Sequence, residues 1–151
     1  MSIKYNKDDL INHNSVGAIV FDNKGRVLVL DHIKYDFHTL PIGKANKNED
    51  PDQKMGEELF EECNIRVESL KEIRRIKKQE VRNNRIVDME IILYEILKWS
   101  GRVYNKEPDK HREAAFVTFE ELLEKTDNGE KTSWITKMFI EHYKNKKVKV
   151  L

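Results

Sequence analysis

The segment from Asp50 to Asn64 limits the fold most strongly, because both of its ends and its apolar pattern indicate one short helix. Asp50 is a favourable N-cap residue, and Pro51 suits the first helical position, where no N–H donor is needed. Gln53 completes a start similar to a capping box. Asn64 is typical of the left-handed residue that ends a helix. The side expected to be buried consists of residues four apart: Met55, Leu59 and Cys63.

The same helix carries three glutamates on one face, Glu58, Glu61 and Glu62, with no lysine or arginine between them. Like charges three or four residues apart on a helix repel each other by about 0.2–0.5 kcal/mol per pair. Water and salt can absorb this cost, and most acidic helix faces are simply solvated. Alternatively a hard cation such as Mg²⁺, which prefers oxygen ligands and commonly bridges to phosphates, lies between the carboxylates. The helix is therefore a candidate metal site.

Two short runs rich in β-branched residues precede the helix, and the residues between them, Asn23-Lys24-Gly25, have a turn composition. We therefore expect residues 15–22 and 26–32 to pair as a β-hairpin. Residues 37–43 follow as an irregular or extended segment that ends at Gly43.

Further apolar runs after the helix predict strands, and the chain closes with helical patterns. The expected strands are residues 65–80, 85–99 and 113–119. Thr118 and Glu121 form a capping box before a short helix. Residues 133–145 predict a terminal amphipathic helix whose inward residues are Trp134, Ile135, Met138, Phe139 and either His142 or Tyr143. With no repeat or linker, we expect one α/β domain over residues 1–151, an α/β/α sandwich around a mixed β-sheet.

The composition excludes several classes of protein. Lys and Arg (28) nearly balance Asp and Glu (27), so the net charge of +1 creates no overall field for nucleic acid or a membrane. Cys63 is the single cysteine and cannot form an internal disulfide, which suits a reducing compartment. Residues 1–10 lack the apolar segment of a signal peptide, and no apolar run is long enough to cross a membrane. We expect a cytoplasmic protein.

Residues 43–65 resemble the Nudix box, G-x5-E-x7-R-E-U-x-E-E-x-G-U, where U is a bulky aliphatic residue. Seven of its nine defined positions match without a gap: Gly43, Glu49, Glu58, Leu59, Glu61, Glu62 and Ile65. Residues 18–32 before the box and 111–122 after it also resemble the corresponding family segments. The resemblance therefore extends over most of the chain and implies a Nudix-like α/β/α sandwich.

The resemblance implies a Mg²⁺-dependent pyrophosphohydrolase, with Mn²⁺ as the alternative metal, that cleaves a nucleoside diphosphate linked to another moiety. It assigns Glu58, Glu61 and Glu62 as catalytic residues and metal ligands, and Gly43 as a further ligand through its carbonyl oxygen. Such metals neutralise the charge of a diphosphate and lower the pKa of a bound water that attacks phosphorus. Glu49 is expected to brace the loop against the helix instead of binding metal.

Residues around the box suggest how a nucleotide-type small molecule would bind. Lys44 is a candidate phosphate contact, although a surface lysine is an equally good interpretation. Tyr35 and Phe37 are candidates to stack on a base, and core or rim packing explains them equally well. The histidines lack the spacing of metal ligands, so we interpret them as solvated or locally bonded: His32, His38 and His111.

Two departures from the family pattern concern charge. Glu57 replaces the arginine of the box, and Lys54, one turn before Glu58, can replace it only as a point charge. Lys110 stands before His111, where many relatives place a glutamate that serves as base or additional ligand. The sequence does not choose among three candidates for that role: Glu90, Glu107 and Glu113. Asn64 in place of the box glycine is expected to be tolerated as a helix end.

Two functions in particular remain open at this point. The first is an active pyrophosphohydrolase, and the second is a Nudix-like module that binds a nucleotide or a partner without turnover. A third, an RNA 5′-end hydrolase, depends only on the basic tail at residues 143–151 and ranks lower, and a nucleic acid partner is not expected. The sequence leaves a homodimer open and does not identify the substrate.

Overall fold

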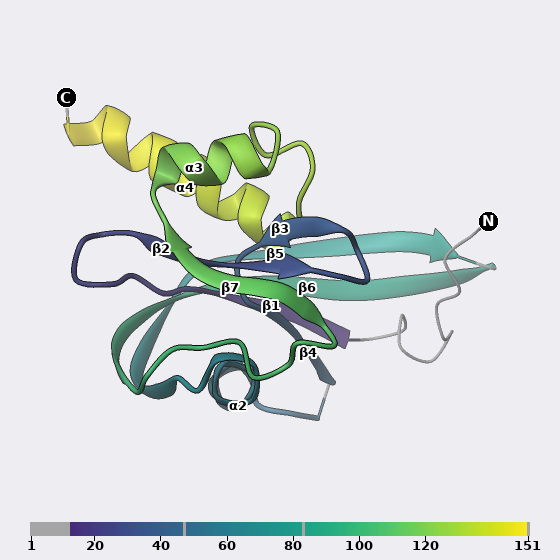
Figure 1. Ribbon diagram of the computed structural model, residues 1–151. Coiled ribbons are helices and arrows are strands. Elements are labelled where there is room, and N and C mark those ends of the chain that lie inside the picture. The colour runs from purple at the N-terminus through teal and green to yellow at the C-terminus, as the bar shows by residue number, and fades with distance from the viewer. Residues whose placement is uncertain (1–12, 47, 83, 151) are drawn as a thin grey trace.

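The computed structural model describes residues 13–46, 48–82 and 84–150. Its strands form two sheets, with helix α2 on one side and helices α3 and α4 on the other (Figure 1). The predicted α/β class, with helices on both faces of the strands, is confirmed. The elements run in this order: β1 (His13–Ile19), β2 (Val27–His32), β3 (Phe37–Thr39), β4 (Ile42–Asn46), α2 (Pro51–Cys63), β5 (Arg66–Arg82), β6 (Arg85–Ser100), β7 (His111–Val117), α3 (Phe119–Lys125) and α4 (Trp134–Val150).

The strands divide between a mixed sheet and an antiparallel sheet. The four-stranded sheet has the order β4-β1-β6-β5, and β1 runs parallel to β6 but antiparallel to β4. The three-stranded sheet has the order β3-β2-β7, with both pairs antiparallel. The predicted mixed sheet is therefore present as the larger of two sheets.

The expected hairpin between residues 15–22 and 26–32 is wrong beyond its turn. Arg26 N donates to Asp22 Oδ1 at 2.8 Å, and Gly25 adopts the positive φ of 76° that the turn requires. The strands beyond meet only through the isolated bridge between Phe21 and Val27 and neighbouring hydrogen bonds. They then diverge, because β1 pairs with β4 and β6 whereas β2 pairs with β3 and β7. The turn residues predict that the chain reverses direction here, but they do not identify the strands with which β1 and β2 pair.

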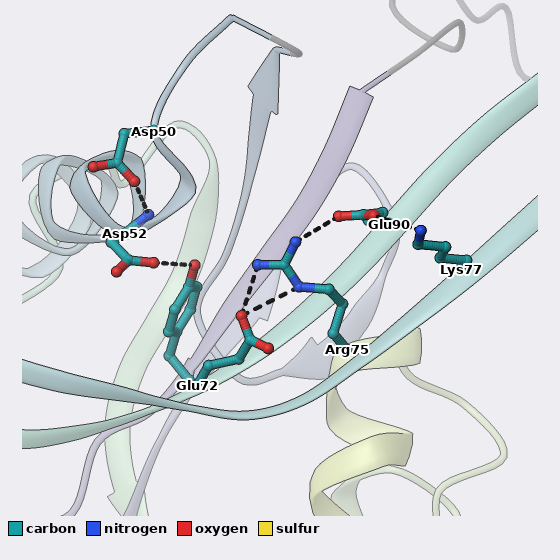
Figure 2. A network of polar contacts seen from close by, with 7 residues as sticks. Asp50, Asp52, Glu72, Arg75, Lys77 and Glu90 are labelled. Carbon is teal, nitrogen blue, oxygen red and sulfur yellow. Dashed lines mark hydrogen bonds and ion pairs between the residues drawn. The ribbon is translucent and has the colours of Figure 1, made fainter.

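The longest predicted pair, β5 and β6, is confirmed as an antiparallel hairpin whose register runs from Arg66–Ser100 to Arg82–Arg85. Asn83, within the predicted connection, lies outside the described residues. Figure 2 shows polar contacts within and between these strands. On β5, Arg75 donates to Glu72 of the same strand at 2.6 Å and across to Glu90 of β6 at 2.7 Å. Cross-strand pairs of opposite charge favour this register.

Helix α2 begins and ends where the sequence predicts. Asp50 accepts a hydrogen bond from the N–H of Asp52 at 3.1 Å, and Asp52 in turn accepts from the Tyr94 hydroxyl at 2.6 Å, which ties the helix start to β6 (Figure 2). Gln53 does not complete a capping box, since its amide donates to Glu57 instead. Asn64 ends the helix in the left-handed conformation, with φ 63° and ψ 31°.

The core lies on both sides of the strands. Against α2, the predicted stripe is fully buried: Met55, Leu59 and Cys63. Against α4, the buried residues include Ile135, Met138 and Phe139, as predicted. Trp134 is the exception, because it remains 50% exposed at the first turn of α4, where the Lys78 ammonium lies 3.7 Å from its ring centroid. Tyr143, which is partly exposed, stacks on Phe119.

The capping box predicted for the short helix is also present, with Thr118 and Glu121 exchanging hydrogen bonds. In the described part of the chain, the helices are too short or too polar to cross a membrane.

Candidate functional site

Strand β4 and helix α2 bring Gly43 and Glu58 into contact. A Cβ atom added to Gly43 would lie 2.6 Å from Cγ of Glu58, which is closer than real Cβ atoms approach. Glycine is therefore needed for the backbone to pass beside this carboxylate. Gly43 belongs to β4, which continues to Asn46, so the predicted end of the extended segment at Gly43 is three residues too early. Two of the predicted site residues thus lie together.

Glu62 is the buried member of the glutamate trio. Its side chain lies one turn beyond Glu58, the residue is only 6% exposed, and its Oε2 atom has no hydrogen-bond partner. Burial, reinforced by the charge of Glu58 and a hydrogen bond to it, raises the pKa of Glu62 to about 9. A buried carboxyl beside a second carboxylate retains its proton unless positive charge arrives. This pair is therefore chemically suited to a cation.

Glu61 does not join them. It lies on the exposed surface of α2, although its spacing from Glu58 predicts that both residues share one face of the helix. Within residues 13–46, 48–82 and 84–150, no group of three or more His, Cys, Asp or Glu side chains stands in an arrangement able to hold a metal ion. The structure therefore brings together Glu58 and Glu62, whereas Glu61 is exposed to solvent.

A fourth carboxylate, Glu107, lies near Glu62 on the segment between β6 and β7. The backbone N–H of Lys106 donates to the carbonyl of Glu62 at 2.9 Å, so the segment runs along the end of α2. The charge of Glu107 contributes to the raised pKa of Glu62. Lys110 follows, with its ammonium 3.2 Å from Glu107 Oε2. No local spacing links residues 62 and 107, which explains why the sequence could not select this glutamate.

The two other candidates for that role lie elsewhere. Glu90 is held by Arg75 and Lys77, at 2.7 and 3.6 Å (Figure 2), and lines a hollow of about 750 Å³ on β5 and β6. Glu113 is exposed on β7, opposite Asp31 of β2. Of the three candidates, Glu107 is the one that the structure places beside the glutamates of α2.

The predicted base-stacking residues belong to an aromatic cluster at the turn between β2 and β3. The rings of Tyr35 and Phe37 lie 5.4 Å apart, and His32 lies 4.6 Å from Tyr35. Tyr35 is 38% exposed. The backbone N–H of Ile33 donates to the carbonyl of Lys110, so this turn adjoins the segment that carries Glu107. Lys44, the predicted phosphate contact, follows Gly43 on β4 and is partly exposed.

Sequence reasoning missed the proximity of His32 and His111. Their rings are 5.1 Å apart in an edge-to-face arrangement, and each Nδ1 atom is buried without a partner. Burial, together with the positive charge of His111 and neighbouring lysines, lowers the pKa of His32 to about 4. Burial likewise lowers the pKa of His111. The two residues pair across β2 and β7, a register that only the topology reveals.

Residues 11–138 match the family model of the NUDIX domain. The chain belongs to the Nudix hydrolase family. The resemblance that the box indicates is therefore confirmed.

Solved structures show the same Nudix fold. The MutT Nudix hydrolase of Burkholderia pseudomallei is 20% identical, with a TM-score of 0.67 over 86% of this chain and 96% of that chain. The MutT protein of Methanosarcina mazei is 19% identical, with a TM-score of 0.68 over 91% and 96%. The Nudix domain of Shewanella oneidensis NrtR, complexed with ADP ribose, is 12% identical, with a TM-score of 0.67 over 94% and 93%. A search of curated proteins finds no match.

In the folded chain, a lysine lies beside Glu58, and the residue that replaces the box arginine points away to solvent. Lys54 lies between Glu49 and Glu58, with its ammonium 3.8 and 3.5 Å from their carboxylates. Although burial acts against it, the charges of Glu58 and Glu49 raise the pKa of Lys54. Glu49 also accepts a hydrogen bond from the backbone N–H of Asn46 at 2.9 Å. Glu57, which replaces the box arginine, is exposed and accepts from Gln53. Lys54 thus supplies a positive charge beside Glu58.

Proposed function

We propose that this Nudix chain is a divalent-metal-dependent pyrophosphohydrolase that cleaves a nucleoside diphosphate linked to another moiety. The supporting observation is the buried Glu62 carboxyl, whose Oε2 atom has no partner although the Glu58 carboxylate lies beside it. Carboxylate oxygens are the donors that Mg²⁺ and Mn²⁺ prefer. A divalent cation would supply the partner that the Oε2 atom of Glu62 lacks.

The residues present fit such a cation by their chemistry. Glu58 and Glu62 would hold it, Glu61 would join them by turning its side chain inward, and Gly43 would offer its carbonyl oxygen. When bound, the metal neutralises diphosphate charge and lowers the pKa of a bound water. Glu107, beside Glu62, is the candidate to take a proton at its carboxylate oxygens or to serve as a further ligand.

Other residues of the chain would orient these groups and the substrate. Lys54 would keep Glu58 in place through their 3.5 Å contact. Tyr35 and Phe37 offer aromatic surface for a base, and Lys44, next to Gly43, offers a cation for a phosphate. The NrtR Nudix domain with the same fold was solved with ADP ribose, which is a nucleoside diphosphate linked to a sugar. ADP-ribose is therefore a reasonable first test compound.

A binding module without turnover is the second candidate. It is favoured by the arrangement of the trio, since Glu61 lies apart from Glu58 and Glu62 and no metal-holding group of three is formed among the described residues. The replacement of the box arginine by Glu57 points in the same direction. On this alternative the chain would bind the same class of nucleotide and release it unchanged.

The deciding experiment is a screen of nucleoside diphosphate derivatives, beginning with ADP-ribose, in Mg²⁺, Mn²⁺ or EDTA. Release of a mononucleotide would be measured by chromatography, and binding by calorimetry. We expect metal-dependent release that is lost in Glu62→Gln and kept in Glu124→Gln, which changes an exposed glutamate on α3. Binding without release would favour the binding module. Neither binding nor release across the screen would contradict both functions.

A further inference from the structure

Asn64 makes a contact that the glycine of the Nudix box could not make. Its backbone is left-handed, with φ 63° and ψ 31°, a conformation that glycine adopts most readily and asparagine tolerates better than most residues. Conformation alone would therefore favour glycine. The asparagine side chain adds a hydrogen bond, however, since its Nδ2 donates to the carbonyl of Arg102 at 3.1 Å.

Arg102 belongs to residues 101–110, called the strap below, which joins β6 to β7. Backbone N–H groups of the strap bind carbonyls at the end of α2: Tyr104 donates to Cys63 at 3.3 Å and Lys106 to Glu62 at 2.9 Å. Such carbonyls have no partner within a helix, so the strap satisfies them. Gly101, with φ 117°, passes so close that a Cβ atom there would overlap the carbonyl oxygen of Asn64.

The far end of the strap is fixed as well. Asn105 donates from its side chain to the carbonyl of His111 at 2.6 Å and accepts from the N–H of Glu107 at 3.1 Å. Glu107 is therefore held between the anchor on α2 and strand β7. Lys110, paired with Glu107 at 3.2 Å, is carried on the same segment. The strap thus determines how both charges lie relative to Glu62.

We propose that Asn64 is a positioning residue: its amide anchors the strap and so holds Glu107, with the Lys110 ammonium paired to it, near the Glu58–Glu62 pair. This inference rests on the proposed function for the role of those carboxylates. A glycine at position 64 would preserve the helix end and would remove the side-chain hydrogen bond to Arg102, leaving the Lys106 ammonium, which donates to the carbonyl of Phe60 at 3.1 Å, as the remaining side-chain hydrogen bond between the strap and α2. The departure from the box therefore becomes part of the site.

The test compares Asn64→Gly, Glu107→Gln and the double variant with the unaltered chain. Asn64→Gly keeps the left-handed turn and removes only the amide. We expect its kcat on the substrate found in the screen to fall about tenfold, while KM changes little. This is the usual loss of activity when a residue that supports metal ligands, without touching the metal itself, is replaced. Since Asn64 acts through Glu107, the double variant should be no slower than Glu107→Gln alone. Asn64→Asp, which keeps the shape and loses the donor, should behave like Asn64→Gly.

Two readouts do not depend on turnover. The Mn²⁺ concentration that gives half of the maximal rise in Tm should increase about tenfold in Asn64→Gly. Amide hydrogen exchange at Tyr104 and Lys106 should also become faster. Thr118→Ala serves as a control, because it removes a hydrogen bond to Glu121 at the start of α3 and should lower Tm without moving the Mn²⁺ midpoint.

The outcomes separate this inference from the proposed function. If the unaltered chain binds Mn²⁺ and hydrolyses its substrate, and Asn64→Gly does both equally well, the positioning role is overturned and the function stands. If the losses in Asn64→Gly and Glu107→Gln multiply in the double variant, Asn64 does not act through Glu107 and the inference is also overturned. If the unaltered chain neither binds Mn²⁺ nor hydrolyses any derivative, the proposed function fails, and the positioning role fails with it.

Discussion

Substituting Glu62 with glutamine should remove a pH dependence of stability that the buried carboxyl creates. In the folded chain without metal, burial and the neighbouring Glu58 raise the pKa of Glu62 to about 9, from an ordinary value of 4.5. Between these two values the folded chain keeps a proton that the unfolded chain has released. The free energy of unfolding must therefore fall as pH rises through this window.

The size of the effect follows from the two pKa values. Well inside the window, one proton of difference lowers the free energy of unfolding by about 1.4 kcal/mol per pH unit. The slope flattens as pH approaches the folded pKa of about 9. Between pH 7 and pH 8.5 the loss should total about 2 kcal/mol. His32 does not interfere, because its lowered pKa of about 4 makes stability rise with pH only below its ordinary value of 6.5.

The assay is urea denaturation in EDTA at several pH values from about 7 to about 8.5. Glutamine keeps the shape of a protonated glutamate and has no proton to lose, so Glu62→Gln should match the unaltered chain only below the ordinary pKa of 4.5 and should already be more stable by about 3 kcal/mol at pH 7. Between pH 7 and pH 8.5 this difference should grow by about 2 kcal/mol. The difference between the two chains cancels the titration of other groups, including the Cys63 thiol, whose pKa burial raises to about 12.

Saturating metal should abolish the dependence. Binding requires the carboxylate form, so each cation bound near neutral pH should displace about one proton from Glu62, and Mg²⁺ should stabilise the unaltered chain more as pH rises. Calorimetry in buffers of different ionisation enthalpy measures that release. Identical pH slopes for the unaltered chain and Glu62→Gln in EDTA would refute the reasoning, because they would show that Glu62 does not hold a proton in the folded state.

Three further substitutions test the neighbouring residues, each by mononucleotide release from the best substrate. Gly43→Ala should lower kcat about tenfold or more, because the added methyl displaces Glu58; unchanged kcat would contradict the contact. Glu61→Gln should raise the Mg²⁺ concentration needed for half-maximal rate, and an unaltered requirement would remove Glu61 from the ligand set. Glu57→Arg should raise turnover at limiting Mg²⁺ and less at saturation. Lower turnover would instead indicate that Glu57 acts as a ligand or base.

Elements with local signals could be predicted from the sequence. The ends of α2 follow from the capping chemistry of Asp50 and the left-handed tendency of Asn64, and both act within a few residues. The buried stripe of α2 follows from helical periodicity. The β5–β6 pair was also predictable, because its connection is short and its apolar runs are long.

Features that depend on distant partners could not be predicted. The partners of β1 are β4 and β6, and β6 lies more than seventy residues later in the chain. Nothing in residues 15–32 indicates that β1 pairs with these strands instead of β2. Glu107 lies near Glu62 because the 101–110 strap binds the end of α2. Helical periodicity places Trp134 on the inward side of α4, but periodicity does not reveal that the first turn of the helix leaves half of this residue exposed.

The two charge reversals in this chain, at Glu57 and Lys110, offset each other. The box arginine has become Glu57 and the glutamate expected before His111 has become Lys110, so one position loses positive charge and the other gains it. In the folded chain, Lys54 lies beside Glu58 and Lys110 lies beside Glu107. A cation thus flanks the carboxylates at each end. This balance favours a site that has kept a function, because a chain under no demand to bind cations or phosphates would have little reason to keep the Glu62 carboxyl buried beside Glu58.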